Sequence, residues 1–181
     1  VELSTIDTAL LLAGALTCRQ YFDQNDVGDR EVRALVDSIY GRVDWQWARD
    51  GGITVSMGWR PEPASYQNAR GFNLSNWRGF DEGMILYILA LGSPTHAIDP
   101  AAWTEWTSTY DRSWRKHFGQ EYLGFAPRFG HQYSQIWVDL RKIQDPFMRQ
   151  HGLDYFENSR RATYAQQAYA IANPRQCKGY G

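Results

Sequence analysis

The chain has 181 residues, the size of one large domain, and its 19 basic and 20 acidic side chains give a formal net charge of −1. A nucleic-acid surface needs a concentrated excess of Lys and Arg, so this balance argues against nucleic acid as a partner. Hydrophobic residues make up 43% of the chain, yet no apolar run approaches the roughly 20 residues of a membrane-spanning helix. The unusual feature is an aromatic content of 15%.

The periodic segments of the first half are helical. Apolar residues surround 4–22 on all sides, which predicts a helix buried on most of its faces. In 29–40, apolar residues recur at i, i+3, i+4 and i+7, which predicts an amphipathic helix. Gly, Pro and Asn interrupt 51–75, which predicts irregular structure with a brief strand at 53–57. A second strongly apolar helix is expected over 79–91.

The second half repeats this pattern. A helix is predicted from Pro100 through Tyr110, a loop over 119–130, and a one-faced apolar helix over 133–143. Asp145-Pro146 is typical of an N-cap followed by Pro at the first helical position, and a long helix is expected from Asp154 to Asn173. Helices buried all round alternate with amphipathic ones, as an inner and an outer ring of helices require. The sequence therefore predicts an all-α fold in one domain or part of one.

The ends of the chain suggest a fragment. The chain starts at Val1 rather than Met and stops at Gly181 with no closing element. The lack of a signal peptide therefore says nothing about the compartment. The two cysteines, Cys18 and Cys177, lack metal-type spacing, so two buried or idle thiols are expected and a disulfide is the alternative.

Three acids introduce the two most apolar helices. Asp7 follows Ser4 at capping-box spacing, and Asp81 and Glu82 occupy the expected first turn of 79–91. Helix capping is the simpler interpretation. The functional interpretation is that both helices are inner staves of a helical barrel and present two carboxylates across a cleft, as glycoside hydrolysis requires.

The aromatic surplus also suggests a sugar site. Sugar rings stack their C–H faces on indole, and their hydroxyls need polar side chains at the edges. Most of the Trp residues are expected in the core. Trp59 and Trp77 lie in loop-like sequence and are the candidates for ligand contact.

Two further clusters hold polar residues near predicted helix starts. His131 and Gln132 precede a helix, and no second His at i+4 makes a zinc pattern, so no metal site is expected. Asp139 and Arg141 could form a partly buried ion pair. In 154–161 the interpretation is capping plus salt bridging, with a substrate-facing edge as the alternative.

Four ordered blocks resemble the glucoamylase-like domain family, and they are Leu3–Gly14, Gly79–His96, Phe129–Ser134 and Asp154–Ala162. The resemblance implies an (α/α)6 toroid, of which residues 1–181 would be the central and later portion. The family includes bacterial endo-β-1,2-glucanases, and related domains occur in cyclic β-1,2-glucan synthases. It also implies a periplasmic or extracellular location.

The resemblance aligns Glu82 with the acidic residue of the family's Asn-Glu block, which makes it the strongest candidate for the general acid. It aligns Asp7 with the acid of the first block, which would help the base or bind a subsite. The chain departs from the family pattern at Asp81, where Asn is usual, and at Gln135, where His follows Tyr-Ser. The expected substrate contacts are Trp59, Trp77, Asp81, His131, Gln132, Tyr133, Asp139, Tyr155, Glu157 and Arg160.

The paired carboxylates predict a glycoside hydrolase, and the resemblance implies an inverting enzyme that acts on β-linked glucan, with β-1,2-glucan as the leading substrate. Glu82 would protonate the leaving oxygen, and Asp7 or Asp139 would help activate water. For inversion the two carboxyl groups should stand about 6.5–9.5 Å apart. The alternatives are a transglycosylase module of a cyclic β-1,2-glucan synthase and a non-catalytic glycan-binding protein. Neither a cofactor nor a metal is expected; the expected partners are a glucan and the remainder of the same domain.

Overall fold

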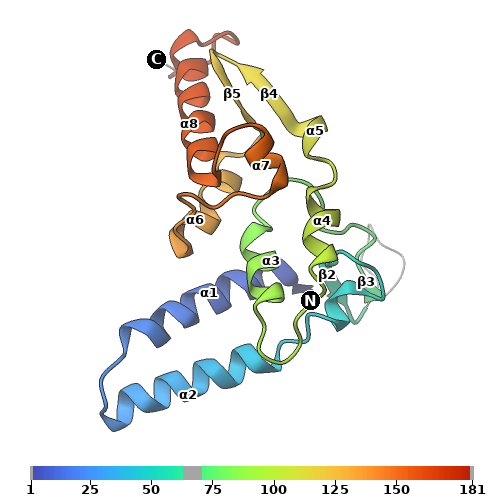
Figure 1. The fold of residues 1–181 in the computed structure, drawn as a ribbon, viewed down its shortest axis with the longest axis vertical. Coiled ribbons are helices and arrows are strands. Elements are labelled where there is room, and N and C mark those ends of the chain that lie inside the picture. Colours follow the sequence, from blue (N-terminus) through green and yellow to red (C-terminus); the bar gives the residue numbers. More distant parts are fainter. Residues whose placement is uncertain (1, 63–70, 180–181) are drawn as a thin grey trace. The chain divides into compact units, whose positions relative to one another are not determined.

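The computed structural model describes residues 2–62 and 71–179 (Figure 1). The chain is rich in helices, which are α1 (Thr5–Tyr21), α2 (Val27–Arg42), α3 (Met84–Leu91), α4 (Ala101–Thr107), α5 (Tyr110–Ser113), α6 (Tyr133–Trp137), α7 (Pro146–Gln150) and α8 (Tyr155–Ala172), with short 3-10 helices η1 (Trp47–Arg49) and η2 (Arg128–His131). The strands are β1 (Leu3–Ser4), β2 (Gly58–Arg60), β3 (Gly71–Phe72), β4 (Trp114–His117) and β5 (Gln120–Leu123). The helices agree with the predicted class, and the strands correct the all-α expectation.

The chain divides into two compact units, which are described separately. Unit 1 comprises Val1–Arg78 and Gly83–Ser108, and unit 2 comprises Gly79–Glu82 and Thr109–Gly181. The division passes between Glu82 and Gly83, so the acidic turn belongs to unit 2 and the apolar α3 to unit 1.

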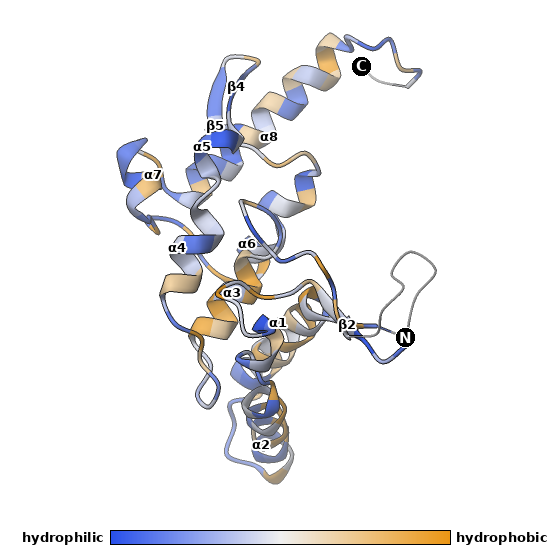
Figure 2. Cartoon of the chain, turned by 90° about the vertical axis from the view of Figure 1, so that its right-hand side faces the viewer, coloured by the Kyte–Doolittle hydropathy of each residue, from blue (hydrophilic) through white to orange (hydrophobic). Residues whose placement is uncertain are grey.

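In unit 1, α1 packs against α2 and α3. The apolar residues of α3 form the centre of the core, with Leu86, Tyr87 and Ala90 fully buried, and α3 is the most uniformly hydrophobic helix in Figure 2. The expectation that α1 is buried on most sides is wrong for the described chain, because Leu11 is 67% exposed. The buried face of α1 consists of Thr5, Ala9, Leu12 and Ala13.

The first three strands form an antiparallel sheet in the order β1-β2-β3, in which Trp59 pairs with Leu3 on one side and with Phe72 on the other. The predicted strand at 53–57 is therefore displaced toward the C-terminus. The N–H of Val55 bonds to the Tyr87 hydroxyl at 3.2 Å, and its C=O accepts from the N–H of Trp77 at 2.9 Å. Because these contacts already satisfy the backbone N–H and C=O of Val55, the residue does not pair with a neighbouring strand.

In unit 2, β4 and β5 form a hairpin that packs on α8. The sequence did not predict this hairpin. Its two-residue loop, Phe118-Gly119, has positive φ at both positions (45° and 71°), as a type I′ turn requires. The usual signal for this turn is Asn-Gly or Asp-Gly, so Phe118 concealed it.

Two helix caps in unit 2 confirm the sequence prediction. The Asp145 side chain accepts from the N–H of Met148, with Pro at the start of α7. The Asp154 side chain accepts from the N–H of Glu157, and α8 ends at Asn173 in the left-handed conformation. The predicted helix over 133–143 is too long, because α6 ends when Val138 turns extended.

Candidate functional site

Asp7 lies in the first turn of α1, in unit 1. The Ser4 hydroxyl accepts from its N–H at 3.2 Å, which confirms that Ser4 is the helix cap. The neighbouring Thr5 hydroxyl donates to the carbonyl of Ser56 at 2.7 Å and accepts from the indole N–H of Trp77 at 2.9 Å. This start of α1 is therefore fixed on one side, while the Asp7 side chain remains exposed.

The two tryptophans predicted to contact sugar differ in their surroundings. Trp77 is 7% exposed and its N–H is bonded to Thr5, so it packs inside unit 1 and has little ring face to offer a ligand. Trp59 is half-buried in β2, with its ring 5.9 Å from that of Trp47. Trp47 itself is 47% exposed and lies 4.6 Å from Phe72, so this cluster of three rings is the accessible one. The sequence analysis did not single out Trp47.

Asp81 and Glu82 lie in a turn before α3 rather than in its first helical turn, because α3 starts at Met84. We call residues 79–82 the acidic turn. At Gly79, φ is +93°, and a Cβ there would come within 2.8 Å of the Thr109 hydroxyl, so this position requires glycine. Capping of α3 by these two acids was the simpler prediction, and this geometry corrects it: the N-cap position is Gly83, which has no side chain to accept a bond.

Phe80 anchors the acidic turn in unit 2. Its ring is 5% exposed and lies 6.1 Å from the Tyr110 ring, 6.2 Å from the Tyr155 ring and 4.9 Å from the His131 ring. Aromatic pairs at these distances contribute beyond their buried area. Phe80 thereby holds the two acids that follow it, a role that the sequence analysis missed.

The two acids are largely withdrawn from solvent. Asp81 is 7% exposed, and its charge contributes to raising the pKa of Tyr110, for which burial is the main cause. Glu82 is half-buried, and among the described residues no hydrogen-bond donor reaches its Oε2 atom, which is itself buried. A carboxylate oxygen in this state is available to a ligand rather than committed to the fold.

Tyr155 was predicted to contact substrate, but it lies in the core of unit 2 with 1% of its surface exposed. Its hydroxyl donates to Asp145 Oδ2 at 2.5 Å and lies 3.2 Å from the Tyr110 hydroxyl. Burial, reinforced by the charge of Asp145, raises the pKa of Tyr155 well above its usual range. These contacts make Tyr155 a structural residue that supports Phe80.

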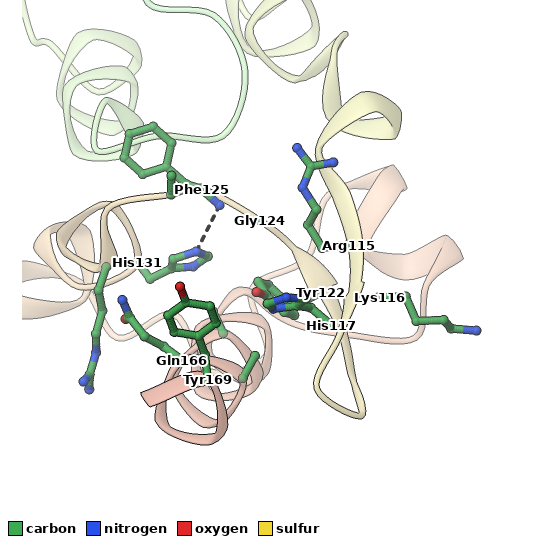
Figure 3. Close-up of a pocket in the computed structure, with 13 residues that line it drawn as sticks. Arg115, Lys116, His117, Tyr122, Gly124, Phe125, His131, Gln166 and Tyr169 are labelled. Atoms are coloured by element: carbon green, nitrogen blue, oxygen red, sulfur yellow. Dashed lines mark hydrogen bonds between the residues drawn. The ribbon is translucent and has the colours of Figure 1, made fainter. Parts of the chain in front are cut away.

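His131 is buried, with 4% exposure, at the end of η2. Its Nε2 accepts from the N–H of Phe125 at 3.3 Å, so the proton of the neutral ring sits on Nδ1 (Figure 3). Burial lowers the pKa of His131 to about 4, so the ring is neutral at pH 7. Among the described residues, Nδ1 has no hydrogen-bond partner.

Two cavities of unit 2 meet at His131. The first has a volume of about 380 Å³ and the second of about 590 Å³. The second brings together three of the predicted substrate contacts, and its lining includes His131, Gln132, Gln135, Ser159, Arg160, Thr163 and Tyr164. Tyr133, also predicted, is half-buried with its ring 5.1 Å from that of Phe129.

The remaining predicted contacts form ion pairs. Asp139 accepts from Arg141 at 2.8 and 2.6 Å, and these bonds lower the pKa of Asp139 to about 2. This pair is exposed, whereas the sequence analysis expected it to be partly buried. Glu157 pairs with Arg160 at 2.6 Å and with Arg161 at 2.9 Å, which confirms the salt-bridging interpretation and lowers the Glu157 pKa to about 2.

Asn158 is a further buried polar residue whose role the sequence analysis missed. Its side chain accepts from the N–H of Leu123 at 2.7 Å and donates to the C=O of the same residue at 3.1 Å, which fixes β5 on α8. An Asn inside a long helix is a poor helix former, and that is the signal that could have indicated a tertiary role.

Several negative observations apply to the described part of the chain. Within residues 2–62 and 71–179, no group of three His, Cys, Asp or Glu is placed to hold a metal ion. Cys18 and Cys177 are free thiols, and both are exposed, so the expectation that they could be buried is wrong. In those same ranges, the structure contains no helix with the length and hydrophobicity to cross a membrane.

The chain matches the model of the family described as "Glycoamylase: Putative glucoamylase" over residues 74–181, a range that contains the acidic turn, His131 and α8. A curated relative, the exo-β-1,2-glucooligosaccharide sophorohydrolase (non-reducing end) of Parabacteroides distasonis, is 27% identical, and the alignment covers 97% of this chain and 26% of that protein.

Two solved structures are also similar. A putative glucoamylase from Bacteroides caccae is 28% identical with a TM-score of 0.79, and the match covers 98% of this chain and 43% of that one. The endo-β-1,2-glucanase from Chitinophaga pinensis, solved with sophorotriose and glucose, is 26% identical with a TM-score of 0.80, covering 98% of this chain and 42% of that one. The chain thus spans about a quarter of the curated relative's length and less than half of either solved chain. Because the family model matches more than half of the chain, the chain belongs to the family of putative glucoamylases.

Proposed function

We propose that this chain is part of a glycoside hydrolase that cleaves β-1,2-linked glucan, and that Glu82 is its general acid. The observation that carries the proposal is the Glu82 carboxyl group, which is half-buried and has a buried oxygen that meets no donor within the described chain. Phe80 holds the preceding backbone against Tyr110 and Tyr155. A positioned, partly dehydrated carboxyl group is what protonation of a leaving oxygen requires.

The names of the similar proteins support the substrate class. One is named a sophorohydrolase that acts on β-1,2-glucooligosaccharides, and another is a β-1,2-glucanase solved with sophorotriose. We extend this substrate class to the present chain, and we place the chain in the central and later portion of an (α/α)6 toroid. We also propose a periplasmic or extracellular location, in keeping with the resemblance.

For the base, we prefer Asp7 to Asp139. Both oxygens of Asp139 accept bonds from Arg141, so that carboxylate is already committed. The Asp7 side chain is exposed in the first turn of α1, where a water molecule can reach it. With Glu82 as acid and Asp7 helping to activate water, the reaction would invert the anomeric configuration.

The test uses the full-length natural protein that contains this chain, with Glu82→Gln as the variant and Glu31→Gln as the matched control, since Glu31 is an exposed residue of α2. On linear β-1,2-glucan, we expect Glu82→Gln to lower kcat by about 10²–10⁴-fold, the usual contribution of a general acid. Glu31→Gln should retain wild-type activity. Undiminished turnover by Glu82→Gln would remove this residue from the catalytic pair.

Product analysis separates the competing functions. Proton NMR of the first products should show inverted anomers, and β-1,3- and α-1,4-glucans should be poor substrates. Cyclic products, which have no reducing end, or linear products longer than the substrate would indicate a transglycosylase. Glucan binding with no cleavage would indicate a non-catalytic binding protein.

A further inference from the structure

The smaller cavity at His131 lies between the β4–β5 hairpin, the segment that follows it and α8 (Figure 3). Its volume of about 380 Å³ falls within the range of about 300–1,000 Å³ that is typical of small-molecule sites. The lining residues named below come from β4, β5, η2 and α8 and from the segment that follows β5, so the cavity is a product of the tertiary fold.

One face of α8 forms a wall of this cavity. Ala162, Ala165, Gln166 and Tyr169 line it at the spacing i, i+3, i+4, i+7, which places them on one side of the helix. The two alanines are buried and too small to fill the space between α8 and the hairpin. Gln166 and Tyr169 border the hollow with an amide and a phenol.

The buried group at this cavity is an unsatisfied donor. Nε2 of His131 accepts from the N–H of Phe125, so the ring proton is on Nδ1, and within the described chain that N–H has no acceptor. The side chain is 4% exposed, so bulk water does not readily satisfy it. A ligand with an oxygen acceptor would.

The walls are aromatic. Tyr122, Phe125 and Tyr169 line the cavity together with His131, and the Tyr122 ring lies edge-on to the imidazole at a centroid distance of 6.2 Å. The two tyrosine rings can stack on the C–H face of a sugar ring, and the Gln166 amide and the tyrosine hydroxyls can bond to sugar hydroxyls. The Phe125 ring itself packs over Gly130 and is turned away from these side chains (Figure 3). This combination of apolar walls with a few polar groups is typical of a specific small-molecule site.

The charges at the cavity are mostly engaged within the protein. Lys116 pairs with Glu121 at 2.6 Å and points away from the cavity in Figure 3, and Arg115 donates to the carbonyl of Arg112 at 3.0 Å. Arg128 lines the cavity from an exposed position. The buried polar group is the neutral imidazole of His131, so a neutral ligand suits this cavity better than an anion.

We propose that this cavity is a binding subsite for one neutral glucosyl unit, with His131 Nδ1–H donating to a sugar oxygen and Gln166 and Tyr169 binding at its edge. The proposal rests on the proposed function for its choice of sugar. It adds a site formed by Tyr122, Phe125, Gln166 and Tyr169, which lie outside the acidic turn.

The experiment measures sophorotriose binding to the full-length natural protein in the Glu82→Gln background, with histidines labelled with ¹⁵N. The Nδ1–H signal of His131 should shift as sophorotriose is added. Gln166→Leu, a change at an exposed position, should raise the dissociation constant for sophorotriose about fivefold, as expected for loss of one hydrogen bond. The matched control is Gln150→Leu, on the exposed surface of α7, which should leave the constant unchanged.

Each other outcome has a definite meaning. An unmoved Nδ1–H signal at saturating sophorotriose, or equal binding by Gln166→Leu and wild type, would overturn the proposal. A shift produced by inorganic phosphate but not by sophorotriose would identify an anion site and would also overturn it. If wild-type protein fails to hydrolyse β-1,2-glucan while the signal still moves with sophorotriose, the proposed function fails and the subsite stands.

Discussion

At the scale of single residues, aromatic rings in unit 2 pack between the acidic turn and His131. Phe80 contacts the rings of Tyr110, Tyr155 and His131, and it directly precedes the two acids of the acidic turn. The same His131 lines the cavity proposed for a glucosyl unit. His131 contacts the Phe80 ring, and Phe80 lies two residues before Glu82. The proposed subsite and the proposed acid are therefore both held by contacts to Phe80.

The first prediction at this scale concerns pH. Because burial lowers the His131 pKa to about 4 from an unfolded value of 6.5, the unfolded chain binds the proton more readily than the folded one. The stability from the neutral ring is present above pH 6.5 and is lost as the pH falls toward 4. Over this window the free energy of unfolding should drop by up to about 3 kcal/mol through this group.

Denaturant unfolding between pH 7 and pH 4 checks this prediction. The free energy of unfolding should depend less steeply on pH in His131→Phe than in wild type. The difference in slope should correspond to at most one proton taken up on unfolding. His117→Phe serves as the control, since this His is exposed, and it should keep the wild-type slope. Equal slopes in His131→Phe and wild type would contradict the assignment.

At the scale of elements, the helices begin and end where local side chains dictate, and tertiary bonds fix their neighbours. Asp145 and Asp154 cap α7 and α8 through bonds to the third following N–H. The β4–β5 hairpin depends on α8 instead, because Asn158 bonds to both backbone groups of Leu123. The hairpin thus forms one wall of the His131 cavity only while α8 holds it.

The prediction at this scale is that Asn158→Leu loosens the hairpin. The substitution leaves the buried N–H and C=O of Leu123 without side-chain partners, which should lower the free energy of unfolding by about 2–4 kcal/mol. Amide hydrogen exchange should accelerate over 114–123. Asn173→Leu at the end of α8 is the comparison variant and should leave exchange in the hairpin unchanged.

At the scale of the whole molecule, much apolar surface of unit 1 lies open. Leu11 on α1, Val27 and Leu35 on α2, and Tyr21 at the end of α1 are each more than half exposed. The chain also separates into two compact units rather than one. Exposed apolar surface of this kind contributes nothing to the hydrophobic stabilisation of the isolated chain.

We therefore expect the isolated 181-residue chain to melt with low cooperativity. Far-ultraviolet circular dichroism should give a broad transition for this chain and, if it is part of a longer hydrolase as we propose, a sharp one for that longer protein. A single sharp transition, with calorimetric and van't Hoff enthalpies equal, would show that the chain folds cooperatively by itself.

The sequence by itself determined the helical class, most helix positions, the caps at Ser4, Asp145 and Asp154, and the family. These features depend on interactions between residues three or four positions apart, so the spacing of residue types along the sequence predicts them. The four ordered blocks identified the family because they preserve that pattern together with Glu82, although Asp81 stands where the family usually has Asn.

Only the tertiary structure decided which polar side chains are available to a ligand. Tyr155 and Trp77 were expected to contact substrate, but Asp145 and Thr5, which belong to other elements of the fold, occupy their polar groups. The N–H of Phe125 donates to Nε2 of His131, which leaves the ring proton on Nδ1, and no acceptor among the described residues reaches it. Local spacing does not report such contacts, since burial and hydrogen-bond satisfaction depend on elements that meet only when the chain is folded.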